Sequence, residues 1–377
     1  MSSGLDVMAA THALSSPRRY RADIAGRILK DIALTVLGLS PAPASPRMIE
    51  FAKLIRELDD SDAVALWRPE TTQAMQVHVE DRDAEAGFVE AQLALALWQS
   101  GCPILGDFPL NADGQLFVRD SLIAFRKGDV LTFAADTVGR SRFEAPLLVK
   151  PKATGARSLA QAIQLADLHR SAAGTSLEYE MEHTRLESLP SCRDAIGPAF
   201  HVIEESGADI ANWVANGVRT IYARGAGDKE LHSGSAGNFA GVVSFALPIP
   251  QPIVSELLVH EASHQHFFVV GFSAPLVKPD APEAYSPLKE TNRPLKKLLL
   301  GYHAVQALLC FYGRHDWRDE VAVRRIRHNL SCAKVFEKSI ESVSSHLTEW
   351  GMEFYRAVGD EMEKTRADLS SYLKAPH

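Results

Sequence analysis

The sequence predicts an α+β fold that is predominantly helical. Most of the chain carries apolar residues at helical spacing, whereas short runs of β-forming residues bounded by turn residues occur mainly near 115–150 and 217–248. The chain has 377 residues, 46% of them hydrophobic, which is enough for two domains or one large unit that buries a site deeply. We expect two consecutive regions, 1–180 and 181–377.

The first region is expected to begin with helices. Residues 22–38 place isoleucine, leucine and valine side chains at helical spacing, and Gly38 suits the end of a helix. Further helical segments are expected around 48–60 and at 84–100, where strong helix formers are frequent. The first hundred residues are therefore predicted to be mainly helical.

A small antiparallel sheet is expected at 115–150, where short β-forming runs alternate with turn residues. Helical periodicity returns at 158–173, and one or two more helices are expected within 181–216. Two strands then follow at 217–226 and 237–248, joined by a polar turn rich in Gly and Ser.

The second of these strands leads into a helix that we place at about 252–270. A Pro-rich loop is expected at 271–291, and a helix at 293–312. The remainder of the chain is amphipathic at helical spacing and predicts a helical packing layer. The strand at 237–248 is either a buried strand or an edge to which an extended peptide adds.

Composition excludes several classes of function. The formal net charge of −7 disfavours nucleic acid as a partner, because nucleic-acid binding depends on clustered Lys and Arg. Four scattered cysteines without a C-x-x-C pair indicate reduced thiols rather than a disulfide framework. The sequence has no secretion signal and no long apolar run, so we expect a cytoplasmic protein without a membrane partner.

The stretch "ELLVHEASHQHFF" contains His260, Glu261 and His264 in H-E-x-x-H spacing on the helix expected at 252–270. Residues four apart share one helix face, so the two imidazoles can bind one metal ion while Glu261 lies beside them as an acid/base group. His266 lies roughly 200° round the helix from His264 and is expected to be a core histidine.

An open catalytic metal site normally has three protein ligands, so a third is expected elsewhere. The extended metalloprotease pattern would need a His where this chain has Val270. Glu283 and Glu290 are available but fall in the Pro-rich loop. His303 lies inside the next helix beside the apolar stripe, where an inward imidazole needs a partner. It is either the third ligand or a core histidine with one hydrogen bond.

The motif "HEASH" followed by "YSPLKETNRPLKKLLLGYHAV" (285–305) resembles the H-E-x-x-H-type 2-oxoglutarate-dependent peptide β-hydroxylases, long known only as proteins with an H-E-x-x-H motif. The likeness covers roughly 230–312 and lies in the order of the motifs. It implies a zincin-like scaffold and an iron(II) dioxygenase that uses 2-oxoglutarate to hydroxylate the β-carbon of a residue in a ribosomal precursor peptide.

Within this resemblance, His260 and His264 match the metal pair, Glu261 the motif glutamate, and Arg293 the arginine of the Arg-Pro pair. A guanidinium can hold the distal carboxylate of 2-oxoglutarate through two hydrogen bonds. Arg293 is otherwise an ordinary surface arginine before a proline.

The chain departs from the family pattern at the helix glycine. Many members carry a His directly before this Gly, where this chain has Leu300, and His303 follows Gly301 by two positions. The third ligand is thus open between His303 and one of the two loop glutamates. Tyr285 and Ser286 are candidates to bind cosubstrate or substrate through their hydroxyl groups, or form a plain turn.

Three functions follow from these observations. The first is the iron and 2-oxoglutarate oxygenase, with His260, His264 and His303 as ligands. The second is a zinc peptidase in which Glu261 is the general base that deprotonates a zinc-bound water. The third is a peptide-binding protein without catalysis. The motif order downstream, and the lack of a peptidase extension, favour the oxygenase.

Overall fold

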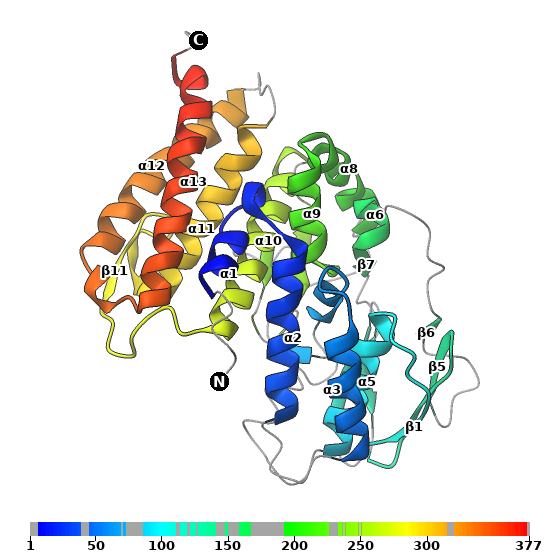
Figure 1. The fold of residues 1–377 in the computed structure, drawn as a ribbon. Coiled ribbons are helices and arrows are strands. Elements are labelled where there is room, and N and C mark those ends of the chain that lie inside the picture. Colours follow the sequence, from blue (N-terminus) through cyan, green and yellow to red (C-terminus); the bar gives the residue numbers. More distant parts are fainter. Residues whose placement is uncertain are drawn as a thin grey trace. The chain divides into compact units, whose positions relative to one another are not determined.

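The α+β, mostly helical architecture expected from the sequence is confirmed in a computed structural model of the chain (Figure 1). The structure describes residues 7–38, 45–68, 71–72, 86–110, 114–118, 121–125, 127–140, 148–149, 158–166, 192–225, 233–235, 237, 239–247, 249, 251–314 and 320–374.

The helices account for most of the described residues. The α-helices are α1 (Val7–Leu14), α2 (Ala22–Gly38), α3 (Pro46–Glu57), α5 (Ala86–Gln99), α6 (Leu159–Ala162), α8 (Cys192–Glu205), α9 (Ala208–Gly217), α10 (Gln251–Ser273), α11 (Leu295–Tyr312), α12 (Glu320–Glu341) and α13 (Glu349–Lys374), with short 3-10 turns η1 (Pro17–Arg19), η2 (Ala63–Leu66) and η4 (Ser344–His346).

The strands form four small sheets. Their members are β1 (Gly106–Pro109), β4 (Val130–Phe133), β5 (Thr137–Arg140) and β6 (Leu148–Val149) in the first, β7 (Gln164–Ala166), β8 (Thr220–Gly225), β10 (Val242–Leu247) and β9 (Ser233–Ser235) in the second, then the hairpins β2 (Gly114–Val118) with β3 (Ser121–Phe125) and β11 (Glu283–Ser286) with β12 (Thr291–Pro294).

Two compact units make up the chain, and their sequences are interleaved. One contains residues 1–24, 199–217 and 251–377, and the other contains 25–198 and 218–250. The units therefore do not follow a division into 1–180 and 181–377. All residues of the candidate site belong to the first unit.

Two expectations near the second sheet need correction. The helix expected at 158–173 ends at Ala162, and the β-forming residues that follow make strand β7; positions beyond 166 lie outside the described residues. The turn expected before 237–248 contains β9, which pairs antiparallel with β10, while β8 and β10 run parallel. Strand β10 is buried between two neighbours, so it is not a sheet edge.

The loop expected at 271–291 contains a further difference. This Pro-rich segment forms the antiparallel hairpin β11–β12, which the sequence did not indicate. Ser286 pairs with Thr291 across a four-residue turn. Glu290 in this turn has a φ of 52°, the one positive φ of a non-glycine residue within the described ranges. Sequence periodicity misses the hairpin because each strand has only four residues.

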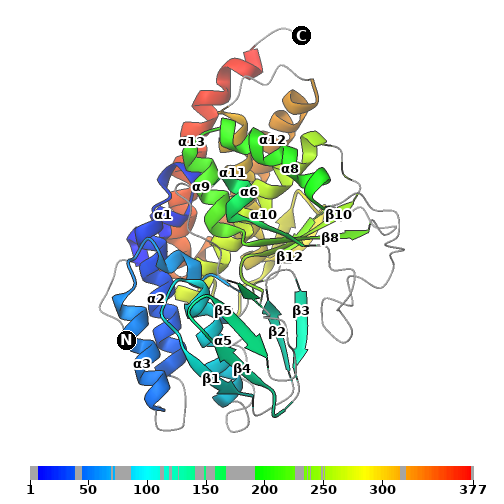
Figure 2. The same cartoon turned by 90° about the vertical axis from the view of Figure 1, so that its right-hand side faces the viewer.

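The first unit is built around α10 and α11, which pack against each other, while α12 and α13 pack on α11 (Figure 1). Helix α1 contacts α13 and α10, and the β11–β12 hairpin packs against α11 and α12. Figure 2 shows α10 directly after β10 in the chain. Over the ranges that the structure describes, no helix is both long and apolar enough to cross a membrane.

Candidate metal centre

Helix α10 carries the H-E-x-x-H motif at its middle and exposes only one face. Most of its side chains are buried, whereas a stripe along one side is partly accessible to solvent. We call this stripe the open face of α10, and it consists of Ile253, Leu257, His260, His264, Phe268, Gly271 and Phe272. At about 100° per residue these positions all fall within one side of the helix. The motif histidines thus lie where a ligand can reach them.

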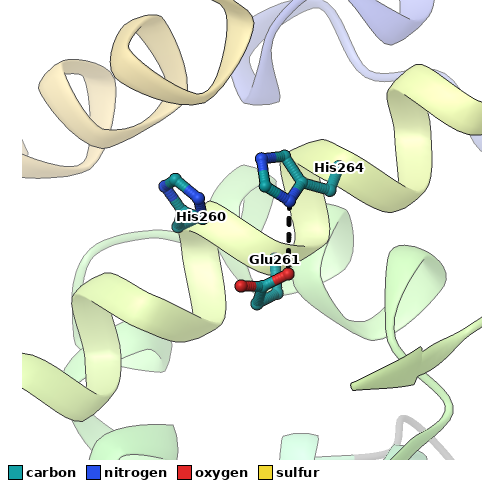
Figure 3. Close-up of side chains that lie close together, drawn as sticks. All are labelled: His260, Glu261 and His264. Carbon is teal, nitrogen blue, oxygen red and sulfur yellow. Dashed lines mark ion pairs between the residues drawn. The ribbon is translucent and has the colours of Figure 1, made fainter. Parts of the chain in front are cut away.

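The structure brings His260, Glu261 and His264 together as expected. One ligand atom from each of the three lies within 4.8 Å of the others. The two imidazole rings are 4.4 Å apart between centroids, and both project from the same side of the helix (Figure 3). Glu261 is buried, and its Oε2 lies 3.3 Å from Nδ1 of His264.

The environment of His260 keeps its imidazole neutral. Burial lowers the pKa of His260, the charges of His264 and Lys289 also lower it, and Glu261 opposes the change, with a net pKa of about 4. A metal ion binds the neutral form of an imidazole. His260 is therefore in the protonation state of a metal ligand at neutral pH, without the cost of removing a proton.

The donor set fits a catalytic metal ion. Two imidazoles and one carboxylate are the ligands of many non-haem iron(II) enzymes, and zinc also accepts them. The fit rests on the identity and proximity of these three side chains. His264, with 17% of its side chain exposed, leaves the group open to solvent on one side.

Glu256, one turn before His260, links helix α10 to two neighbouring helices. Its carboxylate accepts a hydrogen bond of 2.6 Å from the Tyr312 hydroxyl and two of 2.6 Å from the Arg325 guanidinium. Glu256 is thereby tied to α11 and α12 at once. Its position four residues before His260 was visible in the sequence, but its partners were not.

We expect Arg325→Ala to lower the free energy of unfolding by about 2 kcal/mol. A fully buried pair that loses one partner costs roughly 3–5 kcal/mol, and the partial exposure of Arg325 reduces that figure. Chemical denaturation followed by circular dichroism measures the change. The control is Arg324→Ala, an exposed neighbour on α12, which should change stability by less than about 0.5 kcal/mol. Equal stability of both variants would contradict the anchoring role.

His266 behaves as the core histidine that the sequence predicts. Its ring packs on Trp213 with centroids 3.8 Å apart, and its Nε2 is 2.9 Å from the backbone carbonyl of Trp213. Gly217 makes room for it, because a Cβ there would come within 3.0 Å of the imidazole Nε2.

His303 is fully buried, but the structure does not bring it into the metal group. It lies among the rings of Trp213, Phe267 and Phe354, at centroid distances of 5.6, 6.4 and 5.2 Å. Phe267 projects about 60° from His264 around α10, on the buried side. Among the described residues, neither ring nitrogen of His303 has a hydrogen-bond partner of normal geometry.

Burial also controls the charge of His303. Burial lowers the pKa of His303, the charges of His266 and His264 also lower it, and contacts with the backbone of Leu14 and Ser263 oppose the change, with a net pKa of about 3. The imidazole is neutral at all ordinary pH values. His303 thus has the protonation state of a ligand and the location of a core residue.

The three residues predicted to bind a cosubstrate do not all lie on the same face of the β11–β12 hairpin. Arg293 pairs with Ala284 and Ser286 with Thr291, so these side chains share one face, whereas Tyr285 lies on the other. Ser286 is buried, Arg293 is half-buried, and Tyr285 is 45% exposed. Arg293 and Ser286 can face one ligand together, and Tyr285 cannot join them without a change in the hairpin.

The other two proposed ligands are in the same hairpin. Glu283 and Glu290 are exposed, and neither belongs to the metal group of the described residues. Lys289 lies between them in the turn, and its charge contributes to the lowered pKa of His260. The sequence analysis missed Lys289, because only the folded hairpin brings this turn near α10.

No family model matches the sequence, and no curated protein matches it.

Proposed function

We propose that the protein is an iron(II) and 2-oxoglutarate-dependent dioxygenase that hydroxylates the β-carbon of a residue in a ribosomally made precursor peptide. The observation that carries the proposal is the group His260, Glu261 and His264, because two imidazoles and a carboxylate leave positions open for a cosubstrate and oxygen. The resemblance of residues 260–264 and 285–305 to peptide β-hydroxylases supports it, as does β10 directly before α10, which agrees with a zincin-like scaffold.

Each side chain has a defined task in this proposal. His260 and His264 hold the metal, which supplies oxygen activation when bound. Glu261 either completes the ligand set or, as the sequence suggests, acts as an acid/base group beside it. Arg293 holds the distal carboxylate of 2-oxoglutarate, since among the described residues its guanidinium makes no ion pair.

The test is anaerobic loading with iron(II), followed by oxygen, 2-oxoglutarate and a candidate precursor peptide. We expect succinate and a peptide heavier by one oxygen atom, in equal amounts. Peptide cleavage with zinc alone would select the peptidase and reject the proposal. Protein that retains no stoichiometric metal would favour a peptide-binding protein without catalysis.

Arg293→Ala is expected to raise the KM for 2-oxoglutarate about tenfold, because a hydrogen-bonded ion pair is lost. Arg293→Lys should recover part of this loss, since Lys keeps the charge but not the two-pronged geometry. Steady-state succinate formation measures both. Arg324→Ala on α12 is the matched control, and a KM unchanged in Arg293→Ala would remove this residue from the cosubstrate site.

A further inference from the structure

Trp213 on α9 and His303 on α11 are neighbours in the core of the first unit. Helices α9 and α11 both pack against α10 (Figure 1). The two ring centroids are 5.6 Å apart, and the ring planes meet at 70°. Both side chains are fully buried, so bulk solvent cannot supply their hydrogen bonds. Any partner of these two rings must itself lie inside the protein.

The Trp213 indole carries a buried N–H group that needs an acceptor. Its Nε1 can donate a hydrogen bond but cannot accept one. Over the described ranges this atom has no partner, whereas the backbone carbonyl of Trp213 accepts from Nε2 of His266. The rings of His266 and Tyr20 lie beside the indole, at centroid distances of 3.8 and 5.8 Å. Because a buried donor without an acceptor destabilises the fold, an acceptor is expected at this N–H.

The His303 imidazole has the opposite need. A neutral imidazole has one N–H donor and one bare nitrogen that accepts. Contacts with the backbone of Leu14 and Ser263 can serve only the N–H, because a backbone carbonyl does not donate. The neighbouring rings of Phe267 and Phe354 offer no polar hydrogen. The bare nitrogen of His303 therefore needs a donor, and none of normal geometry lies among the described residues.

The needs of the two rings are complementary. A water molecule between them can accept from Nε1 of Trp213 and donate to the bare nitrogen of His303. Gln306, three positions after His303 on α11, is its neighbour on the helix surface and is also fully buried. Its Oε1 has no donor within the part of the chain that the structure describes, so it can accept the second hydrogen of the water. Three hydrogen bonds are typical of a buried water.

An ion does not fit between these groups. An anion would lie against two acceptors, the bare nitrogen of His303 and Oε1 of Gln306. A cation would lie against the N–H of Trp213. Burial of either charge is costly without a counter-charge. Water is neutral and both donates and accepts, so it matches the three groups.

We propose that the core binds one ordered water molecule, which accepts a hydrogen bond from Nε1 of Trp213 and donates one to a ring nitrogen of His303. This water connects α9 to α11, the two helices that pack against the metal helix α10. The site requires neither metal nor turnover. The inference is therefore independent of the proposed function, and each can fail without the other.

A high-resolution crystal structure of the metal-free wild type tests the site directly. We expect one density peak about 2.7–3.2 Å from both Nε1 of Trp213 and a ring nitrogen of His303. A crystal under xenon pressure should show no xenon between the two rings, because xenon occupies dry apolar cavities. A direct hydrogen bond between the two rings, an absent peak, or bound xenon would each overturn the inference.

Nuclear magnetic resonance tests the same water in solution. The full chain is labelled with ¹⁵N at its indole groups, and Trp213→Phe assigns the signal because it removes the N–H and keeps an aromatic ring. We expect cross-relaxation with water at the Trp213 N–H. Trp98 is the internal control and should show none, since it is buried and its Nε1 donates a 2.9 Å hydrogen bond to the carbonyl of Ala134.

His303→Leu should abolish the water signal at Trp213, because leucine removes the acceptor and fills its place. His201→Leu is the matched control, since the His201 side chain is 81% exposed, and it should leave the signal unchanged. A signal of wild-type intensity in His303→Leu would overturn the bridging role of the water. Should His303→Leu fail to fold, the crystal structure and the spectrum of the wild type still decide.

Discussion

His260→Ala and His264→Ala are each expected to weaken binding of iron(II) or zinc more than about 100-fold. Removal of a group that merely supports a metal ligand costs roughly 10- to 100-fold, and removal of the ligand itself costs more. Both imidazoles lie in the group whose ligand atoms are within 4.8 Å of one another. Competition with a chromophoric chelator under anaerobic conditions measures the Kd.

His201→Ala is the matched control, because the His201 side chain is 81% exposed on α8 and outside the metal group. It should bind metal like the wild type. Glu261→Gln distinguishes the two roles of the carboxylate. If Glu261 is a ligand, the substitution should lower metal affinity at least about tenfold. If Glu261 is an acid/base group, the substitution should leave metal affinity nearly unchanged. Wild-type affinity in both His→Ala variants would refute the metal centre.

The second large effect concerns the pH dependence of stability. Since burial lowers the pKa of His303 from 6.5 to about 3, the folded protein cannot accept a proton that the unfolded chain binds below pH 6.5. The contribution of His303 to the free energy of unfolding is therefore constant above pH 6.5 and falls as the pH decreases toward 3. The loss is about 2 kcal/mol at pH 5 and roughly 4 kcal/mol at pH 3.

His303→Leu should remove this dependence while it fills most of the same volume. Denaturant unfolding with chelator present, at pH 7.5 and pH 5, measures the difference between variant and wild type. We expect the wild type to lose about 2 kcal/mol more of its free energy of unfolding than the variant does when the pH falls from 7.5 to 5. A parallel loss of stability in both proteins would contradict the buried neutral imidazole.

The same variant tests the third ligand. The contacts of His303 with Phe267 and Phe354 place it on the buried side of α10, so His303→Leu should keep wild-type metal affinity. A large loss of affinity would instead restore His303 as a ligand, as the sequence suggested.

Long periodic segments made most of the fold predictable. Helix α10 was expected at 252–270 and spans Gln251–Ser273, and α11 was expected at 293–312 and spans Leu295–Tyr312. Short strands were missed where the local pattern was weak. Strand β9 has the sequence SGS, and β12 has TNRP, so Thr291 is the one β-branched residue in these two strands and neither contains an aromatic residue.

The proximity of His260 and His264 was predictable because their spacing is local to one helix. The neighbours of the pair were not, because they depend on the approach of other elements. Arg325 reaches Glu256 from α12 across 69 positions of sequence, and Lys289 reaches the vicinity of His260 only through the hairpin. For His303, helical periodicity predicted a position beside the core. It did not predict which side of α10 the imidazole contacts.

The interleaved sequence of the first unit has a consequence for synthesis of the protein. His12 contacts Glu353 and Arg19 contacts Glu361 across 341 and 342 positions, so α1 and η1 depend on α13 for their partners. The residues of α1 and η1 therefore leave the ribosome well before the α13 residues that they contact. A nascent chain stalled before α13 should lack these contacts and be more sensitive to proteases until α13 has been synthesised.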